Sequence, residues 1–214
     1  MEGQLKNGTI LTSESGNKYT VVNLLGAGGQ GEVYDVECDG KHYALKWYFK
    51  GSATARQKKL LEEIIAKGAP DSSFLWPMEL IVPSRGNLFG YIMPLRPKNY
   101  KSIVDLMKNR VNPSFYVICR TVLNLTKGYR NLHIAGAKYQ DISFGNLFFN
   151  PDNGDVLICD NDNVSYGNSK PGGVLGTPGF MAPEIVRGEK RPSKDTDRYS
   201  LSVLLFYLFM VNHP

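Results

Sequence analysis

Alternating apolar and polar positions near the start of the chain predict three β-strands, at residues 19–25, 32–38 and 42–48. The dipeptide Asp39-Gly40 separates the second run from the third. Such a pair tolerates the positive backbone angles that a two-residue hairpin turn requires. We therefore expect an antiparallel hairpin here, preceded by one further strand.

The spacing of apolar residues then becomes helical. Leu60, Leu61, Ile64 and Ile65 form one stripe that predicts a helix over residues 53–67, and a glycine and a proline directly after it end the helix. Two more strands are expected around a turn at 83–86, over residues 75–82 and 88–93.

After a proline-containing connector at 94–97 the chain is mostly helical, and Pro113 suits the first turn of its longest helix. The predicted elements are helices at 102–108, 113–134 and 196–211, strands at 147–150 and 156–159 joined by a turn at 151–154, and a loop at 164–179. The predicted fold is α+β and bilobal. Residues 1–94 would form a small β-rich lobe, and residues 95–214 a mostly helical lobe.

Composition indicates an ordinary globular protein. Of the 214 residues 42% are hydrophobic, which is enough for a core. The net charge of +5 suits phosphate ligands or acidic partners. Because the basic residues are scattered and no recognised module accompanies them, a nucleic-acid partner is not expected.

Cysteine usage and hydropathy indicate the compartment. Cys38, Cys119 and Cys159 are isolated, which argues against a disulfide framework or a zinc site and favours a reducing cytoplasm. The N-terminus has no apolar signal core, and the most apolar stretch, residues 201–211, covers about half of the ~20 residues that a membrane span needs. We expect a cytoplasmic protein without a membrane partner.

The segment 26–33 reads G-A-G-G-Q-G-E-V, follows the first predicted strand and runs into the start of the second. Glycines let backbone N–H groups approach phosphates without interference from a Cβ atom, so Gly26, Gly28 and Gly31 are candidate phosphate contacts. A strand follows the glycines instead of the helix of a dinucleotide-binding fingerprint. This order favours a hairpin that folds over ATP.

Lys46 lies in an apolar stretch of the third predicted strand, an unusual setting for a surface charge. It could reach the α- and β-phosphates of ATP, and a carboxylate would have to fix its position. The following helix offers Glu62 and Glu63. We prefer Glu62 because Ile65, three residues later, lies beside it on the apolar stripe.

Three polar segments in the second half could carry chemistry. Asp141 could orient the proton of an attacking hydroxyl, and Asn146 offers a neutral oxygen to a metal ion. The apolar run 156–159 leads into Asp160, with Asp162 two residues later, and Thr177 lies in the run G-T-P-G-F-M-A-P-E at 176–184.

These segments and the glycine loop, in this order, resemble the protein kinase family of the Ser/Thr type. Residues 139–146 resemble its H-R-D-L-x-x-x-N loop, 160–162 its D-F-G motif, and 176–184 the end of its activation segment. The resemblance covers residues 19–214. It also implies that the chain stops before the last helices of that fold.

The resemblance implies ATP-dependent phosphoryl transfer to Ser or Thr hydroxyls of a protein substrate, with Mg²⁺ or Mn²⁺. Asp141 would orient the acceptor, Asn146 and Asp160 would hold the metal, and Asp162 could add a contact. Thr177 would donate to Asp141. The remaining nucleotide contacts that it implies are Leu25, Gly26, Gly28, Gly31, Val33, Ala44, Lys46, Met93, Leu95 and Phe148.

The resemblance assigns three further residues to structural roles. His133 would pack in the core, Glu184 would form an ion pair with an arginine from the absent region, and Asp197 would anchor the backbone of the catalytic loop. The final helix carries Leu204, Leu205, Leu208 and Phe209, which would need cover from a neighbouring segment, a partner chain or a second copy.

Departures from the family pattern support a different class of function. Gln140 and Ser143 replace an arginine and a lysine, and Asn161 and Asp162 replace Phe and Gly. Losing the lysine cation predicts slow transfer. The alternative is therefore a pseudokinase, a nucleotide-binding or partner-binding module. A small-molecule kinase is a third possibility, which segment 176–184 disfavours.

Overall fold

The computed structural model describes residues 3–83, 87–167 and 175–211. The chain divides into two compact units, the first made of Met1–Ala69 and Leu75–Arg96, the second of Pro70–Phe74 and Pro97–Pro214. The main division therefore falls two residues after the expected one. The segment Pro70–Phe74 joins the second unit because the Ile158 N–H donates to the Ser73 carbonyl at 2.7 Å.

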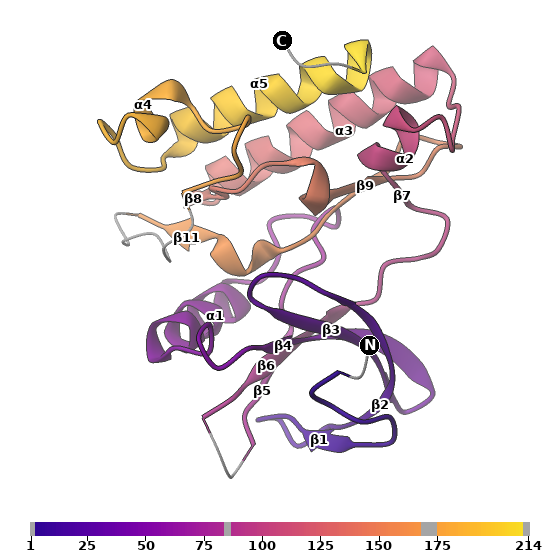
Figure 1. Ribbon diagram of the computed structural model, residues 1–214, viewed down its shortest axis with the longest axis vertical. Helices are drawn as coiled ribbons and strands as arrows, with labels where there is room; N and C mark the ends of the chain where they lie inside the picture. Colours follow the sequence, from indigo (N-terminus) through magenta and orange to yellow (C-terminus); the bar gives the residue numbers. More distant parts are fainter. Residues whose placement is uncertain (1–2, 84–86, 168–174, 212–214) are drawn as a thin grey trace. The chain divides into compact units, whose positions relative to one another are not determined.

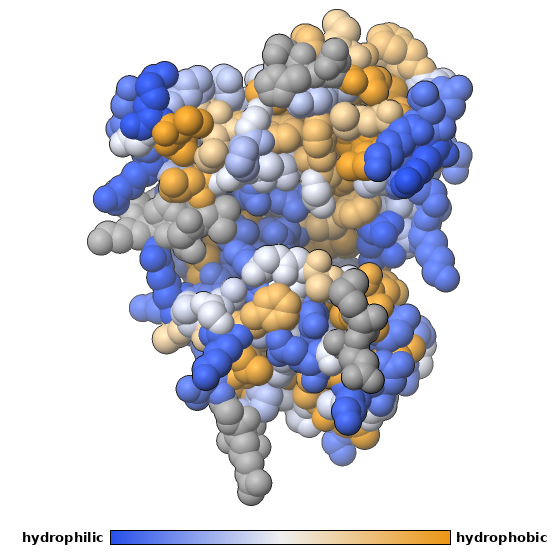
Figure 2. Space-filling model, viewed as in Figure 1, coloured by the Kyte–Doolittle hydropathy of each residue, from blue (hydrophilic) through white to orange (hydrophobic). Residues whose placement is uncertain are grey.

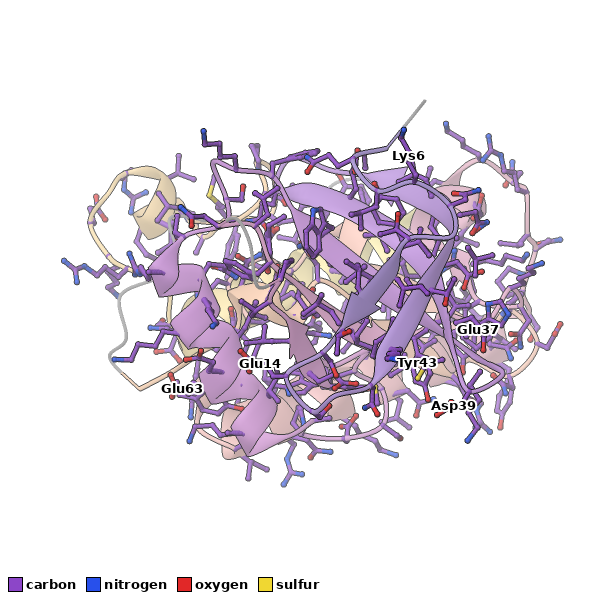
Figure 3. All side chains as sticks on the ribbon, turned by 90° about the horizontal axis from the view of Figure 1, so that it is seen from below. Lys6, Glu14, Glu37, Asp39, Tyr43 and Glu63 are labelled. Atoms are coloured by element: carbon purple, nitrogen blue, oxygen red, sulfur yellow. The ribbon has the colours of Figure 1, made fainter. Side chains whose placement is uncertain are left out.

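The first unit is built on one antiparallel six-stranded sheet with strand order β1-β2-β3-β4-β6-β5 (Figure 1). Its strands are β1 (Ile10–Thr12), β2 (Lys18–Ala27), β3 (Gly31–Cys38), β4 (Lys41–Tyr48), β5 (Glu79–Ile81) and β6 (Gly90–Pro94). The predicted hairpin is confirmed, because Asp39 and Gly40 both have positive φ, 51° and 74°. Figure 3 shows Glu37, Asp39 and Tyr43 near this end of the sheet.

One strand of this sheet was predicted too long, and another was not predicted. The strand expected at 75–82 shortens to β5, because Pro77 lacks the N–H that a ladder needs. The strand β1 was not predicted, since three residues give too little alternation to recognise. The predicted turn at 83–86 lies largely outside the described residues.

The two faces of this sheet differ in character because side chains alternate along each strand. One face contributes fully buried residues such as Tyr34, Val36 and Leu45 to the core of the unit. The other face carries Val33 and Lys46, which are paired across β3 and β4. The Lys46 side chain and the main core thus lie on opposite faces of the sheet.

Helix α1 (Ala55–Lys67) begins after Thr54, whose hydroxyl accepts from the Gln57 N–H at 3.1 Å, and ends at Gly68 with φ 72°. Its start is two residues later than predicted because Thr54 is the N-cap. Leu61 and Ile64 are fully buried. The local signals therefore gave the helix end correctly and its start within two residues.

Glu79 fastens the β1–β2 hairpin to β5. Its carboxylate accepts hydrogen bonds from the Ser15 and Tyr19 hydroxyls and from the Asn17 amide at 3.1 Å. Burial alone would raise the pKa of Glu79, but hydrogen bonds from Ser13, Ser15, Tyr19 and Asn17 outweigh it and hold the pKa below the usual value. The charged carboxylate is therefore the form that stabilises this unit.

We expect Glu79→Ala to destabilise the protein by about 2 kcal/mol at neutral pH, because several hydrogen bonds to a charged acceptor are lost. A native pKa below the unfolded value contributes stability above the usual glutamate pKa and loses it as pH falls through the native value. The deficit of the variant should therefore shrink in acid. Thermal unfolding of both proteins at neutral and acidic pH measures this, and an equal deficit at both would contradict it.

The second unit is mostly helical. Its longer helices are α2 (Ile103–Met107), α3 (Phe115–Ile134), α4 (Pro183–Val186) and α5 (Lys194–Met210), with 3-10 turns η1 (Phe144–Asn146) and η2 (Asn161–Asn163). Its strands are β7 (Lys101–Ser102), β8 (Ala137–Lys138), β9 (Leu147–Phe149), β10 (Val156–Ile158) and β11 (Ser165–Tyr166), in sheets β10-β9-β7 and β11-β8.

Capping residues set the helix starts in this unit. Ser114 caps α3, so Pro113 precedes the cap and does not lie in the first turn as predicted. Ser193 caps α5, which therefore starts two residues before the predicted position. Part of the loop predicted at 164–179 lies outside the described residues, and its beginning forms β11.

Helix α5 has a buried and an exposed side. Leu204 and Leu208 are buried at 0% and 2% exposure, which corrects the expectation that they would face water. Leu205 is intermediate, while Phe209 is 41% exposed and packs against Phe115 with ring centroids 6.1 Å apart. Figure 2 shows hydrophobic side chains near this end of α5. Within the described ranges, no helix has the length and apolar character that crossing a membrane requires.

Candidate active site

The glycine-rich loop joins β2 to β3, and its glycines serve different purposes. A Cβ at Gly31 would lie 2.2 Å from the Trp47 carbonyl oxygen, so the close approach of β4 requires glycine there. A Cβ at Gly26 or Gly28 would meet nothing within 4 Å. Packing within the protein therefore does not demand glycine at these two positions.

Lys46 is buried at 7% exposure on β4. Its ammonium donates to Gln30 Oε1 in the glycine loop at 3.2 Å and lies 5.6 Å from the centre of the Tyr48 ring. The side chain thus links the loop to the strand beside it. This places a cation next to the segment that sequence reasoning assigned to phosphate.

The structure corrects the prediction that Glu62 is the carboxylate partner of Lys46. Glu62 is half exposed and forms an ion pair with Lys58 at 3.8 Å, on the solvent side of α1. The inner face instead carries Gln57, whose amide donates to the Tyr48 hydroxyl at 3.2 Å. The stripe was placed wrongly, because Leu61 is its centre and Glu62 lies roughly 100° around the helix from it.

Glu63, the other glutamate considered, is partly exposed and is labelled on α1 in Figure 3. The same helix is tied to the β1–β2 region by Lys58, which lies 3.4 Å from Glu14. A spacing of four residues linking Gln57 to buried Leu61 was the signal that could have identified the inward polar position.

Val33, Ala44 and Met93, three of the predicted nucleotide contacts, lie on the face of the sheet that carries Lys46. Val33 pairs with Lys46, and Ala44 pairs with Met93 in the register of the sheet. Ala44 and Met93 are buried at 4% and 8%, and Leu25 is 49% exposed. Their assignment to ATP stays a prediction, as does that of Leu95. In the second unit, Phe148 lies on β9 and is partly exposed.

The loop at residues 139–146, which resembles the catalytic loop of kinases and keeps that name below, is anchored by Asp197, as predicted. This carboxylate, 2% exposed on α5, accepts from the backbone N–H groups of Tyr139 at 2.7 Å and Gln140 at 2.9 Å. His133 Nε2 lies 2.9 Å from the same carboxylate, so this histidine is a polar partner as well as a packed residue. A buried charge needs such partners. The loop conformation before Asp141 therefore depends on one side chain.

Asp141 lies directly after this anchored backbone. Its carboxylate accepts from the Thr177 hydroxyl at 2.6 Å, which is the hydrogen bond expected from the sequence. The Asn146 amide donates to the Asp141 carbonyl oxygen at 2.8 Å. These contacts fix the carboxylate while leaving it partly exposed. Such an arrangement can orient a hydroxyl and accept its proton.

Asp160 is brought beside Asn146 by the β9–β10 hairpin. The Cys159 N–H donates to the Asn146 carbonyl at 2.9 Å, and the strands pair Leu147 with Ile158. Asp160 has φ 55°, in the left-handed region that non-glycine residues rarely adopt. Such conformations concentrate at functional sites, where surrounding structure must hold them.

Tyr139 supports this hairpin and was not identified from sequence. It is fully buried, and its hydroxyl donates to the Cys159 carbonyl, immediately before Asp160. Burial, with nearby negative groups, raises the pKa of Tyr139 well above the usual value, so the phenol remains a donor. No sequence pattern marks this contact, since it joins residues twenty positions apart.

The oxygen ligands in this unit fit a magnesium ion. Asn146 uses its Nδ2 in hydrogen bonds to Asp141, which leaves its amide oxygen for a metal, and Asp160 supplies a carboxylate. Asp162 is fully buried in η2, whereas Asp160 is partly exposed. The donor set thus favours Asn146 and Asp160 over Asp162. Within the described residues, no group of three or more His, Cys, Asp or Glu side chains has a metal-binding arrangement.

The residues that depart from the family pattern are buried. The Gln140 amide donates to the Asn163 carbonyl and to the Ser165 hydroxyl, both at 2.7 Å. Ser143 is 7% exposed. Gln140 therefore joins the catalytic loop to the segment after Asp160 through neutral hydrogen bonds.

The segment that resembled the end of an activation segment folds back beneath the catalytic loop. The Phe180 N–H donates to the Thr177 carbonyl at 3.0 Å, and the Phe180 ring packs edge-on against Phe144 with centroids 4.8 Å apart. A Cβ at Gly176 would lie 3.2 Å from the Gln140 carbonyl oxygen. Glu184 lies in the first turn of α4 and has no ion pair with any described residue.

Comparisons with known proteins agree with this geometry. The family described as "Protein kinase domain" matches residues 19–214. The maize probable serine/threonine-protein kinase CCRP1 is 29% identical over 213 residues, covering 96% of this chain and 33% of that protein. Beta-adrenergic receptor kinase 1 of Mesocricetus auratus is 25% identical over 231 residues, covering 99% of this chain and 31% of that protein. The chain thus spans about a third of the length of these curated relatives.

A solved structure supports the fold. The kinase domain of Mycobacterium tuberculosis PknI, crystallised as a double mutant, is similar with a TM-score of 0.70 and 20% identity, covering 98% of this chain and 79% of that one. The α+β architecture, with a β-rich unit and a helical unit, is therefore kinase-like, as predicted. With the match across residues 19–214, this chain belongs to the protein kinase domain family.

Proposed function

We propose that this chain transfers the γ-phosphoryl group of ATP to Ser or Thr hydroxyls of protein substrates. The observation that carries the proposal is the fixed carboxylate of Asp141, held by Thr177 at 2.6 Å beside Asn146, on a loop anchored by Asp197. A pseudokinase that serves only as a binding module would not need a carboxylate fixed in this way. The names of the relatives, a serine/threonine-protein kinase among them, support the choice of acceptor.

Each residue would contribute a separate part of the chemistry. When bound, ATP supplies the phosphoryl group and Mg²⁺ neutralises charge on the phosphates. Backbone N–H groups of the glycine-rich loop and the ammonium of Lys46 would bind phosphate oxygens. The Gly28 N–H is not among these donors, because it donates to the Gly31 carbonyl at 2.8 Å. Asn146 and Asp160 would hold the metal.

Asp141 would orient the acceptor hydroxyl and take its proton as the oxygen bonds to phosphorus and the bond to the departing diphosphate breaks. Thr177 would keep the carboxylate turned toward the acceptor. Thr177 belongs to the segment that precedes α4. This segment would therefore help to select Ser or Thr as the acceptor residue.

The test is transfer from radiolabelled ATP with Mg²⁺ to peptide pools whose only hydroxyl is Ser, Thr or Tyr. We expect label in the Ser and Thr pools, and loss of label in Lys46→Met. Lys41→Met is the matched control, since Lys41 lies exposed on the same strand. A nucleotide-induced thermal shift without any transfer in the unaltered chain would refute the proposal and identify a pseudokinase.

We expect phosphatase treatment to leave this transfer unchanged. Both amide hydrogens of Gln140 are used at 2.7 Å by Asn163 and Ser165, so the segment after Asp160 is held without a phosphate–guanidinium pair. Gln140→Ala should lower activity equally in treated and untreated protein. Loss of activity on phosphatase treatment, restored by a phosphomimetic in the loop, would contradict this.

A further inference from the structure

Residues 3–5 form a short strap across the face of β3 that carries Glu32 and Tyr34. The Gln4 N–H donates to Glu32 Oε2 at 2.8 Å, and the Leu5 N–H donates to the Tyr34 hydroxyl oxygen at 3.0 Å. The Tyr34 hydroxyl in turn donates to the same Glu32 oxygen. The strap is therefore fastened through its backbone to two side chains of one strand.

Both anchoring side chains are buried, Glu32 at 8% and Tyr34 at 0% exposure. Burial, together with the hydrogen bond to Glu32, raises the pKa of Tyr34 to about 12, so its hydroxyl keeps the proton that it donates. A buried carboxylate without donors is costly. The strap N–H thus satisfies a group that the sheet alone would leave poorly solvated.

The contact between the strap and Tyr34 requires glycine at position 3. A Cβ at Gly3 would lie 2.3 Å from the Tyr34 hydroxyl oxygen, much closer than a carbon can approach. The Tyr34 ring is buried in the core and has little room to move aside. Glycine lets the strap backbone lie directly on the ring, and Leu5 adds an apolar contact to the same core.

The anchor lies at the base of the glycine-rich loop. Glu32 follows Gly31 directly and pairs with Ala27, itself inside the loop motif, and with Trp47. The ladder between β2 and β3 has a register shift between Leu24 and Gly26, so its hydrogen bonds restrain this end weakly. A second restraint at Glu32 therefore has a structural reason.

Side-chain alternation separates the strap from the phosphate side. Glu32 and Tyr34 point to one face of β3, and Val33 points to the face of Lys46. The strap consequently leaves that face open and acts on the loop from behind.

We propose that the strap is a positioning element, which holds the base of the glycine-rich loop and thereby sets the affinity for nucleotide. This inference rests on the proposed function, in which the loop binds the phosphates of ATP. Glu32 is a positioning residue that acts through the loop. Releasing the strap leaves the chemical step untouched and lowers the population of loop conformations competent to bind.

The experiment compares the 214-residue chain with a deletion of residues 1–5, with Glu32→Ala, with both changes together and with Gly3→Ala. Calorimetry with a non-hydrolysable ATP analogue and Mg²⁺ gives Kd, and hydrogen exchange reports on residues 24–33. We expect each change to raise Kd about fivefold and to speed exchange in 24–33, with kcat unchanged. Lys6→Ala is the control, since the Lys6 side chain is exposed (Figure 3).

The variant that combines the deletion of residues 1–5 with Glu32→Ala tests whether Glu32 acts through the strap. If Glu32 acts through the strap, the double change should weaken binding no more than the deletion alone. Multiplying effects, or a deletion that leaves Kd and exchange unaltered, would overturn the proposal. If Glu32→Ala does not fold, Gly3→Ala and the deletion carry the comparison.

Failure of the proposed function looks different. An unaltered chain that does not bind the ATP analogue would refute nucleotide binding itself. Hydrogen exchange alone would then decide on the strap, with faster exchange in 24–33 supporting its positioning role and unchanged exchange refuting it.

Discussion

Replacing Asp141 with Asn should lower the rate of phosphoryl transfer by about 10²- to 10⁴-fold, the usual contribution of a general base. In the unaltered protein the Thr177 hydroxyl donates to the Asp141 carboxylate at 2.6 Å. Asparagine keeps a side-chain oxygen that can accept this hydrogen bond, but it cannot take the proton of the substrate hydroxyl. The defect should therefore appear in kcat, with nucleotide affinity little changed.

Asp152→Asn is the matched control, because Asp152 is exposed in the turn between β9 and β10. Steady-state transfer at saturating ATP, together with thermal unfolding, separates chemistry from folding. An Asp141→Asn protein that unfolds like the parent yet transfers at the parental rate would remove Asp141 from the proposed mechanism.

Local signals predicted much of the first unit. Asp39-Gly40 forms its turn from two residues that accept positive φ, and Gly68 ends α1 for a related reason. Such features depend on the conformations open to one or two residues. They can therefore be predicted before any tertiary contact is known.

The orientation of α1 could not be predicted in this way. Leu60, Leu61, Ile64 and Ile65 define a wide stripe, and either edge of it could face the sheet. The choice is made by the Tyr48 hydroxyl, which gives a buried partner to the amide of Gln57. Because that partner comes from another strand, the helix sequence did not reveal that Glu62 faces solvent.

Contacts between distant backbone and side-chain groups were the hardest to foresee. The strands β8 and β11 have two residues each and exist only because they pair with one another. The strap at residues 3–5 has no periodicity, and its partner Glu32 looked like an ordinary strand residue. In contrast, the Thr177–Asp141 and Asp197 contacts followed from the resemblance, since ordered motifs carry long-range information that periodicity lacks.

Asp197→Ala should be the most damaging single change to the second unit. The carboxylate accepts from two backbone N–H groups at 2.7 and 2.9 Å and lies 2.9 Å from His133, with its side chain 1% exposed. Removing it leaves buried donors without an acceptor, at a cost of about 4 kcal/mol. A chain of this size should then unfold roughly 10 °C lower.

Transfer activity should also be lost in the folded fraction, because the Tyr139 and Gln140 amides no longer fix the backbone that carries Asp141. Asp195→Ala is the control: it lies in the same first turn of α5, but its side chain is 82% exposed and pairs with Arg198 at 2.7 Å. An exposed pair of this kind contributes about 0–1 kcal/mol.

Thermal unfolding of the two variants and amide exchange at Tyr139 and Gln140 distinguish the outcomes. We expect fast exchange at both amides only in Asp197→Ala. Asp197→Asn, which keeps one acceptor oxygen, should fall between the two and remains measurable if the alanine variant does not fold. Equal unfolding temperatures for the Asp195 and Asp197 variants would mean that the loop is held by other contacts, and that a single buried carboxylate does not determine where Asp141 lies.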